Sequence, residues 1–236
     1  MTAERGRKWP WILMAAVLLV TAASIVSDKI KARQGPPDPL PAEVKPWFGP
    51  RNQTEALTAA DNGVTNARGR LQSAPDEWLR LEMLGRALAA RFRISGSYAD
   101  LAEADAVLAR GMANSEPPAG PSLSRATVAV LAHRLDAADA ALKRFDSQKG
   151  EPTKDEEADG WAIKGDIAFQ RGDIKRARLA YARAEEVESN ASIALRQSML
   201  ALRTGDPLLA RRRVNAVLRA GKLTRSAKAQ TALMRA

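Results

Sequence analysis

Residues 158–190 carry the pattern that most restricts how this chain can fold. Large and small residues recur there at intervals that predict two helices lying back to back around a glycine turn, namely Trp161, Gly165, Gly172, Ala177, Tyr181 and Ala184. One such pair cannot bury its apolar face by itself, so it requires neighbouring pairs in a stacked array. An array of this kind typically binds other proteins, and Trp161, Tyr181 and the alanines are themselves interpreted as core residues.

The composition agrees with a wholly helical fold. Alanine, leucine, arginine and glutamate are abundant in the second half of the chain and favour helices. Runs of Val, Ile and Thr with the alternation of a strand are absent from the sequence. The 236 residues, 45% of them hydrophobic, are enough for one medium-sized domain with additional segments. We therefore predict the all-α class.

The pair at 158–190 resembles a tetratricopeptide repeat. In that family a large residue, a glycine four positions later and small residues on the second helix let the two helices approach closely, as Trp161 and Gly165 would do here. Gly205 lies 33 residues after Gly172, close to the family's period of about 34 residues. Looser matches extend the resemblance over roughly residues 76–220. It implies a helical-hairpin solenoid that binds proteins.

The expected helices follow this pattern from one end of the body to the other. A Ser73–Asp76 capping box is expected to start the second helix and a Thr153–Glu156 capping box a later one. Gly63 and Gly69 weaken the first helix, each by roughly 1 kcal/mol relative to alanine. The expected helices are 53–71, 76–92, 98–110, 122–133, 136–145, the pair within 158–190, a pair at about 191–220 and a last helix from about Leu223.

Ahead of this body lies a segment expected to cross a membrane. Residues 9–26 are uncharged and mostly apolar, and as a helix these 18 residues would reach about 27 Å, close to the roughly 30 Å of a bilayer core. Trp9 and Trp11 suit an interfacial position. A cleaved signal peptide, with Val20–Ala22 as its cleavage site, and a buried core helix are the alternatives.

The expected order of domains follows from these segments. Basic residues flank the segment on both sides, but the short N-terminal tail favours an N-terminus in the cytoplasm and a body outside it. The Ala- and Arg-rich style suggests a bacterium, so the body would be periplasmic and the protein a single-pass inner-membrane protein. The domains are a cytoplasmic tail (1–8), a transmembrane anchor (9–26), a proline-rich stalk (27–52) and a tetratricopeptide-like array (53–236), with its best repeat at 158–190 and the next at 191–220.

The family resemblance implies that first helices line a concave face that holds a partner. Helical spacing maps that face to a groove that is apolar with an acidic edge. Burial of some of these residues against a neighbouring helix is the alternative interpretation. The predicted protein-binding groove consists of Asp159, Ala162, Asp166, Phe169, Gln170, Leu195, Met199 and Leu202.

The net charge of +10 is concentrated at the two ends of the chain. Residues 191–236 hold ten Lys and Arg against Asp206 alone, and Arg211, Arg212 and Arg213 form a predicted basic patch. Such a patch suits an anionic lipid or an acidic protein. Nucleic acid is disfavoured, because this stretch contains no aromatic residue for base stacking. A solvated helix face is the simpler interpretation.

Nothing in the sequence indicates an enzyme, a cofactor or a metal site. The chain has no cysteine, and His133 is its only histidine. No phosphate-binding glycine loop and no nucleophile elbow occurs. We expect no small-molecule substrate and no catalytic, cofactor-binding or metal-binding residues.

The sequence thus predicts a membrane-anchored scaffold that recruits a protein partner in the bacterial cell envelope. By analogy with cytochrome c maturation factors, which combine a membrane segment with a tetratricopeptide body, envelope assembly or a process like cytochrome c biogenesis is the suggested setting. Binding of anionic lipid or another polyanion through the basic C-terminal helices is the alternative function.

Overall fold

Nine α-helices, and no strands, make up the part of the chain that the computed structural model describes, residues 49–116, 119–147 and 150–219. All nine belong to one unit, Pro41–Ala236. The all-α prediction is confirmed for these residues. The helices are α2 (Gln53–Ser73), α3 (Trp78–Ser95), α4 (Tyr98–Asn114), α5 (Ser122–Leu131), α6 (Leu135–Asp146), α7 (Lys154–Gln170), α8 (Ile174–Val187), α9 (Ala191–Arg203) and α10 (Pro207–Arg219).

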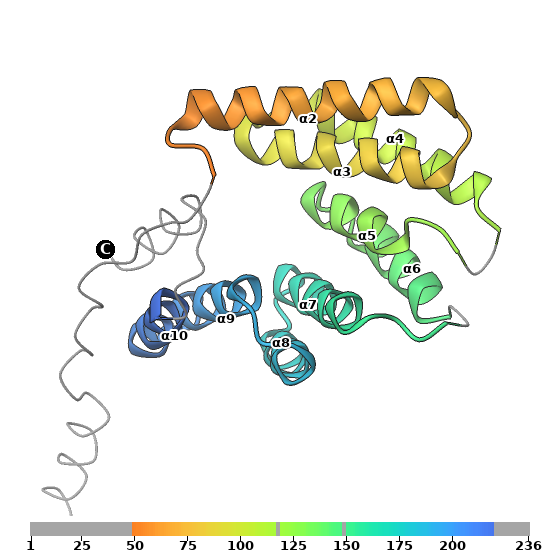
Figure 1. Ribbon diagram of the computed structural model, residues 1–236. Coiled ribbons are helices and arrows are strands. Elements are labelled where there is room, and N and C mark those ends of the chain that lie inside the picture. The colour runs from red at the N-terminus through yellow and green to blue at the C-terminus, as the bar shows by residue number, and fades with distance from the viewer. Residues whose placement is uncertain (1–48, 117–118, 148–149, 220–236) are drawn as a thin grey trace, which may run out of the picture. The chain divides into compact units, whose positions relative to one another are not determined.

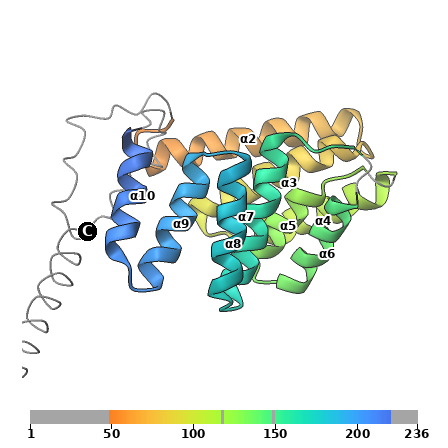
Figure 2. The same cartoon turned by 90° about the horizontal axis from the view of Figure 1, so that it is seen from below.

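The helices pack as four antiparallel hairpins, α3–α4, α5–α6, α7–α8 and α9–α10, with α2 lying along α3 (Figure 1). We call α3, α5, α7 and α9 the first helices, and α4, α6, α8 and α10 the second helices. Each first helix also packs against the next one, in the order α3, α5, α7, α9. Figure 2 shows α7, α8, α9 and α10 as neighbouring helices in this array. The observed hairpins are the stacked helix pairs expected from the sequence.

Local signals fix most of the helix ends. Gly172 and Gly205 have φ angles of 79° and 80°, in the left-handed region that favours glycine, and they form the turns inside the last two hairpins. The predicted capping box of α7 is present, because the Thr153 hydroxyl accepts from the Glu156 amide and the Glu156 carboxylate accepts from the Thr153 amide. Pro207 occupies the first position of α10, where its missing N–H costs nothing.

The capping box expected at Ser73–Asp76 is wrong. Ser73 is the last residue of α2, and α3 begins after Glu77, whose side chain makes no capping hydrogen bond. Arg80 organises this turn instead. Its guanidinium donates to the Arg70 carbonyl at 2.6 Å and also bonds the Ser73 hydroxyl and the Glu77 carboxylate. The capping-box motif does not take Arg80 into account, so it predicted a helix start two residues before the observed one.

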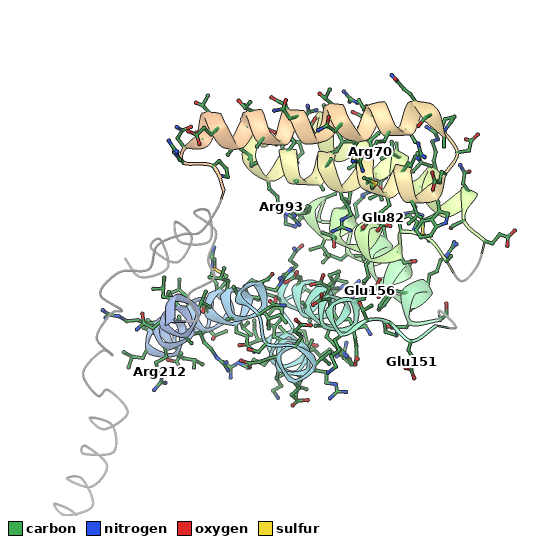
Figure 3. The ribbon with its side chains drawn as sticks, viewed as in Figure 1. Arg70, Glu82, Arg93, Glu151, Glu156 and Arg212 are labelled. Atoms are coloured by element: carbon green, nitrogen blue, oxygen red, sulfur yellow. The ribbon has the colours of Figure 1, made fainter. Side chains whose placement is uncertain are left out.

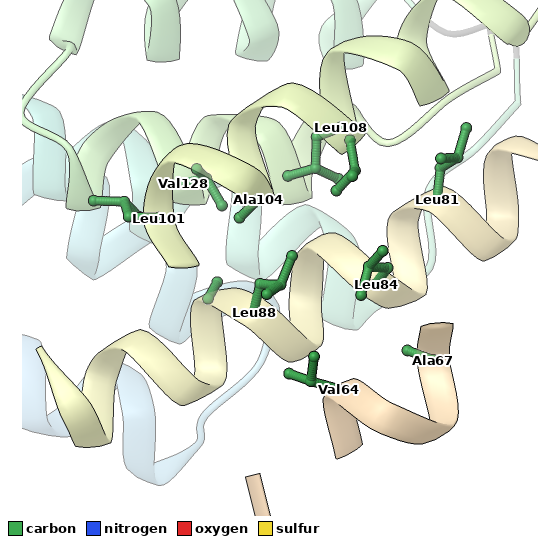
Figure 4. Close-up of a cluster of buried hydrophobic side chains, with 11 residues drawn as sticks. Val64, Ala67, Leu81, Leu84, Leu88, Leu101, Ala104, Leu108 and Val128 are labelled. Carbon is green, nitrogen blue, oxygen red and sulfur yellow. The ribbon is translucent and has the colours of Figure 1, made fainter. Parts of the chain in front are cut away.

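The largest buried cluster joins α2, α3, α4 and α5. Val64 and Ala67 of α2 point toward Leu84 and Leu88 of α3 (Figure 4). Leu88 is completely buried. The cluster as a whole contains Val64, Ala67, Leu81, Leu84, Leu88, Ala89, Leu101, Ala104, Val107, Leu108 and Val128. Because α2 adds two of these residues, it closes one end of the array against solvent, as a terminal capping helix must in a repeat protein.

Glycines on first helices let the second helices of the hairpins approach closely. A Cβ placed on Gly165 would lie 2.4 Å from two ring carbons of Tyr181, and a Cβ on Gly85 would lie 2.5 Å from Cγ of Leu108. Both distances are too short for non-bonded carbon atoms. The same position in two hairpins therefore needs a residue without a side chain, so the large residue opposite it can pack against bare backbone.

Several sequence-based expectations concern residues outside the described part. They are the cytoplasmic tail, the transmembrane anchor at 9–26, the stalk up to residue 48 and the helix from Leu223. Among the helices that the structure describes, none combines the length and the apolar character needed to cross a bilayer.

Substituting Gly165→Ala tests the close approach within the α7–α8 hairpin. We expect the free energy of unfolding to fall by about 1–3 kcal/mol, because the buried Tyr181 ring must move to admit the new methyl group. Chemical denaturation followed by circular dichroism measures the change. An unchanged unfolding midpoint would show that the contact is not restrictive.

Gly69→Ala is the matched control, since it makes the same chemical change in the exposed interior of α2. A Cβ there meets nothing within 4 Å. We expect this variant to be more stable by roughly 0.5–1 kcal/mol, because alanine loses less backbone entropy than glycine in a helix. A destabilised Gly69→Ala chain would contradict the placement of α2.

Candidate functional site

The first helices of the four hairpins enclose a cavity of about 890 Å³. We call the surface that lines it the central groove. Because consecutive first helices pack against one another, residues far apart in the sequence share this surface. Its lining residues are Trp78, Glu82, Arg86, Ala89, Ala90 and Arg93 of α3, Ala119 and Gly120 of the preceding loop, Ser122, Leu123, Ser124, Thr127 and Val128 of α5, Phe145 of α6, Asp155, Glu156, Asp159 and Ile163 of α7, and Asn190, Ser192 and Arg196 from the start of α9.

Charged side chains from opposite walls face the central groove. Glu82 and Arg93 lie on the side of α3 that faces α7 and α9, and Glu156 lies on the side of α7 that faces α3 (Figure 3). The Glu82 carboxylate accepts a hydrogen bond of 2.6 Å from the Ser124 hydroxyl of α5. The groove is therefore lined by both signs of charge, whereas the sequence suggested an apolar groove with an acidic edge.

A partly buried polar network holds Arg196 at the central groove. The Tyr181 hydroxyl of α8 donates to Asp166 of α7 at 2.8 Å, and the Arg196 Nε of α9 donates to both Asp166 carboxylate oxygens at 3.0 Å. Tyr181 is only 2% exposed. Burial raises the pKa of Tyr181, and the charge of Asp166 raises it further, so the phenol remains a donor. This chain of bonds joins three helices and positions the Arg196 side chain in the groove.

The surroundings in the central groove shift the pKa values of two residues. Although Asp159 is exposed, the walls displace part of its hydration, and this desolvation raises its pKa, against the opposing effect of the nearby Arg196 charge. The pKa of Arg93 is lowered, first by desolvation and then by repulsion from Arg196. The guanidinium remains fully charged at neutral pH, but it lies in surroundings that disfavour a second cation.

Two of the predicted groove residues belong to this site and one is core. Asp159 lines the central groove, and Asp166 holds Arg196 at its edge. Ala162 is completely buried in a cluster with Ala184 and Ile193, so it presents no surface to a ligand. Helical spacing placed Ala162 on the correct helix, but the neighbouring helices α8 and α9 cover it. This outcome matches the alternative of burial against a neighbour.

The other five predicted residues do not line the central groove. Phe169 packs against the cluster that contains Tyr181, and Gln170 contacts His133 Nδ1 at 2.9 Å. Leu195 and Met199 are half-buried, and Leu202 is 42% exposed.

Sequence reasoning missed the contributions of α3 and α5. Gly85 aligns with Gly165, so the position that follows each glycine is Arg86 in α3 and Asp166 in α7. Applying the same offset to the upstream repeat identifies Arg86 as a groove residue. No local signal identifies Arg93 or Arg196, because their meeting depends on how α3 and α9 are placed by the hairpins between them.

A second hollow of about 590 Å³ lies between α6, α7 and α8, outside the central groove. The Lys164 ammonium lies 4.5 Å from the centre of the Trp161 ring and 2.9 Å from Asp146. Leu179 of α8 borders this hollow and is 71% exposed. The cations around it are engaged in ion pairs. Arg171, for example, has two aspartate partners.

The predicted basic patch is only partly available. Arg211 and Arg212 are exposed on α10. The Arg213 guanidinium instead forms an ion pair of 2.5 Å with Glu185 of α8. The patch therefore offers two exposed arginines from this helix, and the third holds two hairpins together.

Four carboxylates line the central groove, those of Glu82, Asp155, Glu156 and Asp159, but the one histidine of the chain does not. His133 is exposed at the end of α5, with a φ angle of 55°, and lies away from the central groove. Within residues 49–116, 119–147 and 150–219, no group of three or more His, Asp or Glu side chains is arranged to hold a metal ion.

The Tyr181–Asp166–Arg196 network supports a measurable prediction. Asp166→Ala should lower the free energy of unfolding by about 1–3 kcal/mol, because the buried Tyr181 hydroxyl loses its acceptor. Tyr181→Phe alone should cost about 1 kcal/mol. In the Tyr181→Phe background, Asp166→Ala should cost less than in the original chain. Strictly additive effects in a double-mutant cycle would show that the two residues are not coupled.

Comparison with protein families agrees with the hairpin architecture. A family model described as a tetratricopeptide repeat-like domain matches residues 83–204, which is just over half of the chain. The matched region runs from within α3 to the end of α9 and so contains most of the central groove. No curated protein and no solved structure matches the chain. The match over these paired helices and their glycine turns shows that the chain belongs to the tetratricopeptide repeat family.

Proposed function

We propose that this protein is a membrane-anchored scaffold that holds a segment of a partner protein in its central groove, within the bacterial cell envelope. The groove is the observation that carries the binding role. Its cavity of about 890 Å³ is lined by residues from all four hairpins, so it offers an extended surface to a ligand. Membership of the tetratricopeptide repeat family supports a role in protein–protein interaction, since these domains generally act as scaffolds without catalysis.

The sequence supports the anchor part of the proposal. Residues 9–26 contain no charged residue, and Arg5, Arg7 and Lys8 precede them. An apolar stretch of 18 residues is long enough for a single span. The six prolines between residues 35 and 51 disfavour a continuous helix and would hold the array away from the membrane surface.

The proposed location is the inner membrane with the array in the periplasm. A short N-terminal tail with three basic residues is easily retained in the cytoplasm. The proposed setting is assembly of envelope proteins, or a process like cytochrome c biogenesis, and it rests on analogy with membrane-attached members of the family.

Photo-crosslinking tests whether the central groove holds a protein. A photoreactive amino acid at Ala90 or Ser192, both exposed and both in the groove, should give the same protein adduct in living cells. The matched control is Lys175, which is exposed on α8 and does not line the groove. Equal adducts from Lys175, or none from either groove position, would contradict the proposal.

A second candidate function is binding of anionic lipid or another polyanion through the basic C-terminal helices. Arg211 and Arg212, exposed on α10, are the observation that favours it. Basic residues near a membrane contribute about 1 kcal/mol each when they face anionic lipid. The engagement of Arg213 by Glu185 weakens this candidate, because it removes one of the three predicted contacts.

Membrane extraction separates the anchor from electrostatic binding. If residues 9–26 span the membrane, the chain should stay in the membrane fraction at 1 M salt, where the screening length is about 3 Å. Deleting residues 9–26 should release it, and Arg211→Glu with Arg212→Glu should not. Release by salt or by the double substitution would favour the second candidate.

Reporter fusions test the orientation. A periplasm-active reporter fused after Ala236 should be active, whereas activity of a cytoplasmic reporter would reverse the proposed orientation.

A further inference from the structure

Three arginines from opposite ends of the array meet at the central groove. Arg86 and Arg93 come from α3, and Arg196 comes from α9. No packing interface joins α3 to α9, which are connected through α5 and α7. The three side chains nevertheless line one cavity, and the charge of Arg196 acts on Arg93. Figure 3 shows Arg93 on the side of α3 that faces α7 and α9.

Arg86 and Arg93 form no ion pair within the described part of the chain, unlike several arginines elsewhere in it. Arg91 forms ion pairs with Asp100 at 2.6 Å and Asp61 at 3.1 Å, and Arg171 is held by two aspartates. In contrast, neither Arg86 nor Arg93 forms an ion pair or a side-chain hydrogen bond with any described residue. Arg196 is neutralised by Asp166 from the side of α7.

An unpaired guanidinium pair in a hollow favours an anion. Both arginines are exposed at the surface of the hollow, and Arg93 is partly desolvated there. Partial exclusion of water strengthens electrostatic interactions relative to bulk water, and guanidinium groups bind carboxylates through two parallel hydrogen bonds. A carboxylate between α3 and α9 would relieve the repulsion between Arg93 and Arg196. It would also supply the partners that Arg86 and Arg93 lack within the described chain.

The opposite wall restricts which anion fits. Asp155, Glu156 and Asp159 of α7 line the same cavity as the arginines. A uniform polyanion, such as nucleic acid, would be repelled by these carboxylates. A peptide segment can place an acidic side chain against the arginines and a neutral or basic one against α7.

We propose that Arg86, Arg93 and Arg196 bind acidic side chains of the partner segment, and that this segment bridges α3 to α9. The inference rests on the proposed function, because it identifies the chemistry of the ligand in the same groove. Binding would then couple the first and last hairpins, which the fold itself leaves without a direct interface.

A binding experiment with a defined peptide tests the charge recognition. The probe is a fluorescent peptide of alternating Glu and Ala, amidated at its C-terminus, and fluorescence anisotropy measures its binding to the full chain in detergent. Arg93→Glu should weaken binding at least about tenfold, since each charge-assisted hydrogen bond is strong. Arg212→Glu makes the same charge change on exposed α10 and should have less than about a twofold effect.

Three further arms complete the test. A peptide with Gln in place of Glu should bind weakly, Arg93→Lys should retain part of the affinity, and inorganic phosphate should compete only poorly. Unfolding midpoints of all variants show whether each one is folded. Equal binding of the Glu and Gln peptides, or equal losses in Arg93→Glu and Arg212→Glu, would overturn acidic recognition. Strong competition by phosphate would assign the arginines to a free anion instead.

Distance measurements test the bridge between α3 and α9. The chain has no cysteine, so spin labels at Leu79→Cys and Arg203→Cys would be unique, and both positions are exposed on these two helices. The Glu peptide should narrow the distribution of distances between the labels. An unchanged distribution with bound peptide would overturn the bridge.

Crosslinking at Ala90 and Ser192 does not depend on the Glu peptide, so it tests the proposed function separately. A protein partner crosslinked there, together with no binding of the Glu peptide, would refute only the acidic ligand.

Discussion

The close approach of paired helices is the constraint on which the rest of this structure depends. Tyr181 of α8 packs against the bare backbone of Gly165 in α7, where any side chain would collide with its ring. Because the ring reaches so far toward α7, its hydroxyl meets Asp166, and Asp166 in turn holds Arg196 of α9. Because Gly165 has no side chain, Tyr181 and Asp166 can position the Arg196 guanidinium at the edge of the central groove. Stability and recognition share the same contacts here.

The array separates two kinds of charged surface. Outside the central groove, several arginines are paired with nearby carboxylates, and Arg91 joins α3 to α4 through the buried Asp100. The exposed pairs among them contribute little to stability. The groove is different, because Arg86 and Arg93 form no ion pair with a described residue. Glu82 on the same helix accepts a hydrogen bond from Ser124 instead, and the charge of Arg196 repels Arg93. An unsatisfied charge on a hollow surface is a feature that a binding partner can use.

Much of the local structure was predictable because its causes are local. The spacing of small and large residues, the glycine turns and the Thr153–Glu156 capping box place helices within a few residues of their observed ends. The prediction at Ser73–Asp76 was wrong because Arg80, from the following helix, bonds the Arg70 carbonyl and the Ser73 hydroxyl at the end of α2. The groove was predicted only in part. Asp159 lines it, whereas Ala162 is covered by neighbours that helical spacing within one repeat does not reveal.

The sequence by itself determined the helical class, the pairing of helices and the family, because these follow from patterns within about 34 residues. It also carries the apolar segment at 9–26 on which the proposed anchor rests. Only the tertiary structure decided which residues form the groove. Arg93 and Arg196 are separated by more than 100 positions, and they share one cavity because the intervening hairpins place α3 opposite α9. Small differences in packing at each hairpin add up over that separation, so no local pattern in the sequence specifies the meeting.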